Sequence, residues 1–232
     1  LLESLFVCSQ DIDVNDLLRC LICTETTALL YGNETLLRSI LRESHMKYEM
    51  EAFAKVIYRL ACTLPLKGKC MNLIFDAILR LSSSEHKQIR IWGARSLYKQ
   101  SLVEARSFFF TRTPAALKTI IRLSGDEDSE VQYIGTKIIG NLVSHRLNQR
   151  TLTKNASLMA SLTEAVEQRA SKEAVKALLN LADNSKYTKT LAKQHNVVSS
   201  LSMYGSELSA GKDNKELKRA ALSCVTRLVP LM

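Results

Sequence analysis

Apolar residues recur along the chain with the spacing of amphipathic helices. In EAVKALLNLADN, residues 173–184, most positions are Ala, Val or Leu, which predicts a largely buried helix. Asn180 lies in the middle of this pattern, although its amide competes for backbone hydrogen bonds and is unfavourable inside a helix. Asn141 has the same setting 39 residues earlier, in TKIIGNLVSH. Two asparagines in equivalent places indicate an internal repeat.

The pattern around Asn180 occurs six times, with a period near 40 residues. The equivalent residues, which we call the first row, are Arg19, Arg59, Lys99, Asn141, Asn180 and Arg227, at intervals of 40, 40, 42, 39 and 47 residues. The last interval is longer because it contains YGSELSAGKDN, residues 204–214. We expect an exposed loop there, since its Gly, Ser, Lys and Asp residues have little to bury.

A second shared pattern lies between these helices. A short helical segment ends near Thr113-Pro114, Asn155 or Asn196, and an amphipathic helix follows it. Asn is the best non-glycine residue for the left-handed position that ends a helix. Each repeat is therefore predicted to contain a short, a medium and a long helix.

Small and capping residues recur within the long helices. The residue six positions before the first row is small in four repeats, at Gly93, Gly135, Ala174 and Ala221. Because Gly inside a helix costs about 1 kcal/mol relative to Ala, it predicts a close helix crossing. Candidate N-caps precede three of these helices, at Ser129, Ser171 and Asn214.

The period near 40 and the run LLNLA…N…K…L…NVV..L around residues 178–201 resemble the armadillo repeat family. Asn141 and Asn180 fall where that family has its ladder asparagine. The resemblance implies an all-α fold, a right-handed superhelical solenoid of about five to six three-helix repeats like those of β-catenin and importin-α. The expected repeats of this single domain, 1–232, are 1–30 (partial), 31–64, 65–104, 105–147, 148–186 and 187–232. Because the sequence begins without Met, we expect it to be a piece of a longer protein.

A second row of residues shares the face of the first. It lies four positions earlier on each helix and consists of Asn15, Lys55, Arg95, Lys137, Lys176 and Ser223. Of the twelve positions in the two rows, eight are basic, three are Asn, one is Ser and none is acidic. An ordinary solvated helix surface mixes both signs, so this pattern favours a binding surface. The alternative is that the rows are only a solvated face.

The asparagines have a specific use under the resemblance. An amide side chain both donates and accepts, so it can pair with both groups of an extended backbone. Armadillo proteins hold extended peptides in this way, and importin-α places Trp four residues before each Asn, where this chain has Lys137 and Lys176. That difference favours an acidic ligand. The expected partner-binding residues are Arg19, Lys55, Arg59, Arg95, Lys99, Lys137, Asn141, Lys176, Asn180 and Arg227.

Composition and charge agree with a helical protein that binds anions. The 232 residues are 46% hydrophobic, with 8 Gly and 3 Pro, which argues against an all-β fold. The formal net charge of +9 favours anionic partners. No apolar run approaches the roughly 20 residues of a membrane-spanning helix. The six cysteines lack a disulfide framework, which indicates reduced thiols packed as small hydrophobes and an intracellular protein, cytoplasmic or nuclear.

No segment carries the pattern of a catalytic, cofactor or metal site. Cys20 and Cys23 have no second ligand pair, and no glycine-rich phosphate loop or metalloprotease motif occurs. Acidic residues 126–128 precede a long helix, where they favour its dipole. Trp92 is expected to pack in the core or at its edge, and Phe108–Phe110 to be buried, with an exposed partner patch as the alternative. We expect no catalytic residue, no metal and no cofactor.

The sequence therefore predicts a non-enzymatic scaffold. Its basic concave groove would bind an extended acidic protein segment, phosphorylated or not. The alternative is that the same basic surface binds a nucleic-acid backbone. A third interpretation is a purely structural subunit of an assembly, with the basic residues solvated.

Overall fold

The computed structural model describes residues 50–63, 68–169, 171–193, 196–206 and 215–231, and within these ranges the regular structure is helical throughout. The chain divides into two compact units, residues 1–100 and 101–232. Several predictions concern residues outside the described ranges. These are the partial first repeat, the row positions Asn15 and Arg19, the pair Cys20 and Cys23, the cap at Asn214, and most of the 204–214 segment.

The described part of the first unit consists of three helices, α5 (Met50–Thr63), α6 (Gly68–Ser82) and α7 (Lys87–Ser101). Its core contains Ile57, Ile78 and Leu97, each almost fully buried. α5 and α7 are the two helices predicted to carry first-row residues. The Gln100 side chain of α7 donates a 2.6 Å hydrogen bond to the carbonyl oxygen of Ala61 in α5, 39 residues away, so the two equivalent helices are in contact.

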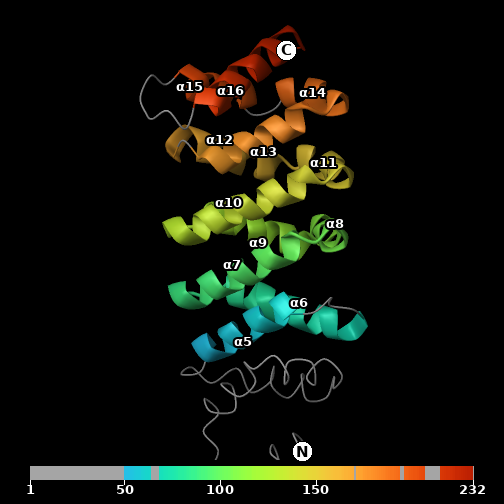
Figure 1. Ribbon diagram of the computed structural model, residues 1–232, viewed down its shortest axis with the longest axis vertical. Coiled ribbons are helices and arrows are strands. Elements are labelled where there is room, and N and C mark those ends of the chain that lie inside the picture. The colour runs from blue at the N-terminus through green and yellow to red at the C-terminus, as the bar shows by residue number, and fades with distance from the viewer. Residues whose placement is uncertain (1–49, 64–67, 170, 194–195, 207–214, 232) are drawn as a thin grey trace, which may run out of the picture. The chain divides into compact units, whose positions relative to one another are not determined.

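The second unit contains three successive sets of three helices. They are α8 (Glu104–Arg112), α9 (Pro114–Ser124) and α10 (Ser129–Ser144); α11 (Arg146–Thr153), α12 (Ala156–Arg169) and α13 (Lys172–Ala182); α14 (Ser185–Ala192), α15 (Val197–Ser206) and α16 (Lys215–Leu228), which a short 3-10 turn η2 (Val229–Leu231) follows. Each helix contacts its counterpart in the next set, and Figure 1 shows α8, α11 and α14 following one another along one side of this unit. The short helix comes first in every set. The predicted order of lengths is wrong in the second set, where α12 has 14 residues and α13 has 11.

Helix boundaries follow the capping chemistry, with two corrections. Ser171 caps α13 as predicted, accepting from the backbone N–H of Ala174. Ser129 instead begins α10, whose cap is Asp128; its carboxylate accepts from two backbone N–H groups of the first turn. A carboxylate at this position also interacts favourably with the helix dipole.

The predicted helix breaks differ among themselves. Asn196 has the left-handed φ of 55° expected of a helix-ending asparagine. Asn155 does not have a positive φ; its side chain accepts from the backbone N–H of Leu158 and so caps the start of α12. Thr113 ends α8 in extended backbone and Pro114 opens α9, where its missing N–H costs nothing.

The recurring small residues lie at close helix crossings. A Cβ added to Gly93 of α7 would approach the Cα of Ser82 at the end of α6 to 2.7 Å. A Cβ on Gly135 of α10 would lie 2.5 Å from the backbone of Leu123 and Ser124 at the end of α9. Ala174 and Ala221, at the equivalent places, are fully buried. The close crossing predicted from the sequence is therefore present in both units.

Aromatic and cysteine side chains are only partly buried. Phe110 lies in the core, whereas Phe108 and Phe109 are half-buried, and the Arg112 guanidinium lies 3.9 Å from the centre of the Phe108 ring. Cys224 is buried, and this burial raises the pKa of its thiol. Cys62 is exposed, so the expected packing of this thiol as a core residue is wrong.

The crossing can be tested with two glycines of one helix, because nothing lies within 4 Å of a Cβ placed on Gly140 of α10. Gly135→Ala must displace backbone and should destabilise the protein by about 1–3 kcal/mol. Gly140→Ala gains helix propensity and should stabilise it by about 0.5–1 kcal/mol. Urea unfolding followed by circular dichroism measures both. Equal effects of the two substitutions would contradict the close crossing.

Candidate functional site

The first unit carries four predicted binding residues, and two of them lie beside one tryptophan. Lys55 and Arg59 lie on α5, and Arg95 and Lys99 on α7. The half-buried Trp92 ring has the Arg95 guanidinium 5.0 Å and the Lys55 ammonium 5.9 Å from its centre. Both distances allow cation–π attraction. Trp92 thus packs at the edge of the core, which was one of the two positions expected for it. Its ring also contacts two residues of the predicted binding face.

Tyr58 completes this cluster on α5. Its ring centre lies 5.3 Å from that of Trp92, with the planes tilted by 55°. Burial raises the pKa of the Tyr58 hydroxyl, and a hydrogen bond with Cys62 adds to the effect. The Lys55 ammonium also pairs with Glu51 at 2.9 Å, so an acidic residue neighbours the second row. The aromatic surface in this part of the face is therefore in contact with the chain's own cations.

The second unit brings three pairs of row residues together on neighbouring helices. α10 carries Lys137 and Asn141, α13 carries Lys176 and Asn180, and α16 carries Ser223 and Arg227. α13 contacts both α10 and α16, so the row positions succeed one another across this unit.

The second-row lysines have close neighbours on their own helices. The Lys137 ammonium lies 4.6 Å from the centre of the exposed Tyr133 ring. Lys176 is exposed and lies 3.8 Å from the carboxylate of Glu173. Such an exposed pair contributes only about 0–1 kcal/mol, so the lysine can exchange it for a ligand at little cost.

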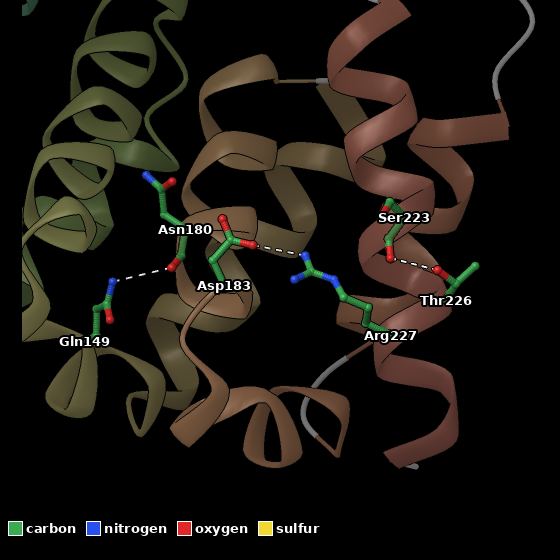
Figure 2. Close-up of polar contacts among 6 residues, drawn as sticks. All are labelled: Gln149, Asn180, Asp183, Ser223, Thr226 and Arg227. Atoms are coloured by element: carbon green, nitrogen blue, oxygen red, sulfur yellow. Dashed lines mark hydrogen bonds and ion pairs between the residues drawn. The ribbon is translucent and has the colours of Figure 1, made fainter.

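The two ladder asparagines differ in how much of the amide is available. The Asn141 side chain donates a 2.9 Å hydrogen bond to the hydroxyl of Ser101 and is half-buried. Asn180 is exposed, and its side-chain amide has no hydrogen-bond partner among the described residues. Its backbone oxygen accepts a 3.4 Å hydrogen bond from the Gln149 side chain (Figure 2). Asn180 therefore presents both a donor and an acceptor to solvent.

The first-row Arg227 is held by an acidic side chain of the preceding repeat. Its guanidinium lies 3.0 Å from the carboxylate of Asp183, three residues after Asn180 (Figure 2). The hydrogen bond to Asp183 raises the pKa of Arg227, which is charged in any case near neutral pH. The rows contain no acid, but Asp183, Glu173 and Glu51 lie directly beside them.

Asn180 lines a cleft of about 770 Å³ that the repeat pattern did not predict. Its walls come from the ends of α10 and α13 and the beginnings of α11 and α14, and we call it the α11–α14 cleft. Three basic side chains line it, Arg146, Arg150 and Lys186, together with the apolar surfaces of Leu147 and Tyr187. Leu147 is 69% exposed. The sequence feature that could have indicated this cleft is the basic residues that directly follow two of the repeat helices, in HRLNQR and NSK.

Hydrogen bonds of amide side chains join the helices that form the cleft. The Asn148 side chain, 1% exposed, donates to the Ser107 hydroxyl at 2.6 Å and accepts from the Thr111 hydroxyl at 3.1 Å. Gln149 donates to the carbonyl oxygen of Val143 and accepts a 2.7 Å hydrogen bond from Asn184. These side chains join α8 to α11 and α11 to α14, so consecutive repeats are tied together beside the cleft.

Other chemical features are sparse in the part of the chain that the structure describes. A smaller cleft of about 350 Å³ lies at the opposite ends of α10 and α13, lined by Tyr133, Arg169 and Glu173 among others. Within the described ranges no three His, Cys, Asp or Glu side chains gather as they would around a metal ion. None of the described helices combines the length and apolar character needed to cross a membrane.

Comparison with known proteins identifies the fold. No protein-family model and no curated protein sequence matches the chain. Among solved structures, a designed armadillo repeat protein in complex with the peptide (KR)4 aligns with a TM-score of 0.67 at 17% identity, covering 91% of each chain. A second designed armadillo repeat protein gives 0.64 at 17% identity, covering 91% of this chain and 92% of its own. Computationally designed armadillo repeat proteins for modular peptide recognition give 0.66 at 16% identity, with the same coverage. The chain has an all-α, armadillo-like repeat fold.

The buried and exposed asparagines should respond differently to truncation. Asn148→Ala leaves buried hydroxyls without their partner and should lower the free energy of unfolding by about 1–3 kcal/mol. Asn180→Ala removes an exposed amide and should change it by less than about 0.5 kcal/mol. Urea titrations of both variants against the wild type measure the difference. A destabilisation by Asn180→Ala as large as that by Asn148→Ala would show that Asn180 serves the fold.

Proposed function

We propose that the chain is a non-enzymatic scaffold whose two rows bind an extended acidic segment of another protein. The observation that carries this proposal is the exposed Asn180 amide, which has no partner among the described residues, follows Lys176 by one helical turn and lines the α11–α14 cleft. An Asn inside a helix is unfavourable unless its side chain has a use. A backbone laid along the rows would pair with its donor and its acceptor together.

The charge of the face supports an acidic ligand. Lys137 and Lys176 stand where the armadillo resemblance would place tryptophans for a basic ligand, and the Trp92 ring is in contact with Lys55 and Arg95 of the same chain. The (KR)4 peptide belongs to a designed protein of the same fold. In this chain a basic peptide would be repelled by the half-buried Lys137 and the exposed Lys176, and near Trp92 it would have to displace Lys55 and Arg95. An acidic segment would instead be attracted by the cations of whichever unit it binds.

The same geometry limits the affinity. Neighbouring helices lie about 10 Å apart, so α10, α13 and α16 together span about 20 Å, or about six extended residues. Each exposed ion pair contributes about 0–1 kcal/mol and each amide hydrogen bond about 0.5–1.5 kcal/mol. Three such ion pairs and two such amide hydrogen bonds supply at most about 6 kcal/mol, so a ligand of this length is expected to bind more weakly than micromolar, which corresponds to about −8 kcal/mol.

A nucleic-acid ligand is the second candidate, and it is favoured by the Trp92 ring, which lies beside Tyr58, Lys55 and Arg95. Tyr58 and Trp92 would offer stacking surfaces to bases, and Arg59 and Lys99 would contact phosphates. Arg95 and Lys55 already lie over the Trp92 ring, which makes stacking compete with intramolecular contacts. We therefore place the acidic protein segment first.

Charge reversal tests the proposal. Lys137→Glu with Lys176→Glu should abolish binding of an Asp/Glu-rich peptide, because attraction becomes repulsion at the centre of the face. Asn180→Ala should weaken the same peptide by about 0.5–1.5 kcal/mol, with little change in salt dependence, because it removes a neutral contact. Calorimetric titration at about 50 and 300 mM salt measures both effects.

A control variant for this double charge reversal has the same change in net charge at two lysines outside the rows. Lys118 of α9 and Lys154, which ends α11, are exposed and lie outside both the rows and the α11–α14 cleft. Lys118→Glu with Lys154→Glu should retain most of the binding. If both double variants lose it equally, the peptide responds to net charge alone. If neither loses it, the rows are a solvated face.

A further inference from the structure

The α11–α14 cleft gathers cations whose side chains have no partner within the described residues. Neither a hydrogen bond nor an ion pair engages the side chains of Arg146, Arg150 and Lys186 there. Three cations of the rows differ, since Arg227, Lys176 and Lys55 are each beside a carboxylate. Three like charges around one concave surface raise the local potential for an anion, because the low-dielectric walls focus the field.

The acidic residue of the cleft wall is already neutralised. Asp183 is the carboxylate among the described lining residues, and its oxygen lies 3.0 Å from the Arg227 guanidinium (Figure 2). An entering anion therefore meets three cations without a partner among the described residues. It also meets one carboxylate, Asp183, whose charge is balanced by Arg227 of α16. Without Arg227, Asp183 would oppose the anion directly.

The remaining lining adds a neutral contact and an apolar contact. The Asn180 amide provides an open donor, whereas the nearby Gln149 and Asn184 amides are bonded to each other. Leu147 and Tyr187 provide apolar surface beside the cations. A suitable ligand thus combines a strongly anionic group with an adjacent apolar side chain.

We propose that the α11–α14 cleft is a subsite for a phosphorylated side chain of the bound segment. This inference rests on the proposed function, which supplies the segment. A phosphate group carries a charge of about −1.5 to −2 and three strong acceptor oxygens, which a single carboxylate does not match. Arginine binds phosphate through paired N–H groups, and two arginines line this cleft. The position of Asn180 at its margin makes the subsite continuous with the rows.

The proposal predicts opposite effects of two substitutions in the cleft wall. Asp183→Asn removes the carboxylate that offsets Arg227, so the net positive charge at the cleft rises by one, and retention of phosphopeptides should rise up to about fivefold, the factor that corresponds to about 1 kcal/mol. Arg150→Glu places a negative charge in the cleft and should remove the preference for phosphopeptides. Both side chains are exposed, so the fold should be unchanged, as circular dichroism and the melting temperature will verify.

The probe is a degenerate library of Asp/Glu-rich peptides with a central phosphoserine followed by an apolar residue. One half of the library is treated with phosphatase, and both halves are passed over the immobilised chain at about 50 and 150 mM salt. We expect the phosphorylated half to be retained several-fold more strongly. Lys118→Glu should leave this ratio unchanged, since Lys118 is exposed on α9 and lies outside the cleft.

Each outcome separates this inference from the proposed function. Equal retention of both halves, lost on Lys137→Glu with Lys176→Glu, would uphold the acidic-segment scaffold and overturn the phosphate subsite. A fall in phosphopeptide retention with Asp183→Asn would also overturn the subsite. If neither half is retained above a blank surface, the proposed function fails, and the subsite fails with it. If single-stranded oligonucleotide is retained instead, and Arg150→Glu releases it, the phosphate belongs to nucleic acid and the phosphopeptide proposal is wrong.

Discussion

Buried amide and hydroxyl side chains that bond to the neighbouring repeat set the register of this stack. Apolar contacts between helices are non-directional, so a stack held by them alone could slide by a turn. The Asn148 side chain cannot slide, because its donors and its acceptor are satisfied by two hydroxyls of α8 and a carbonyl at the end of α10. A shift would leave these buried groups without partners, at about 1–3 kcal/mol each. The same logic applies to Gln149 with Asn184 and, in the first unit, to Gln100 with the Ala61 carbonyl.

The binding face depends on that register. The row residues follow one another across α10, α13 and α16 only because each long helix keeps the same rotation relative to the last. Gly135 allows α10 to approach the end of α9 closely, and buried alanines occupy the equivalent places in α13 and α16. The α11–α14 cleft forms where two such repeats meet, between the end of one long helix and the start of the next short one. The predicted binding rows and the α11–α14 cleft thus both result from the same packing of one repeat on the next.

The sequence predicted the parts of the structure that follow from periodicity. Spacing near 40 residues located α5, α7, α10, α13 and α16, and the small residues correctly indicated close crossings. Contacts between residues that are not in equivalent positions could not be predicted in this way. Asp183 binds Arg227, 44 residues away, and Trp92 meets Lys55 of another helix. The α11–α14 cleft was missed for the same reason, since it combines the ends of four helices. Ser129 was mistaken for a cap because Asp128 offers the same chemistry one residue earlier.

The bonds that tie each repeat to the next have a consequence for cooperativity. In the described part of the second unit the bonds named above join nearest neighbours. The stability of this unit is then approximately a sum of repeat terms and interface terms, and a weak repeat can open without its distant neighbours. A ligand that spans α10, α13 and α16 would add a coupling between repeats that do not touch. When this ligand is bound, single repeats of the second unit would no longer open separately, and the unit would unfold as a whole. The ligand would determine the size of the cooperative unit as well as its stability.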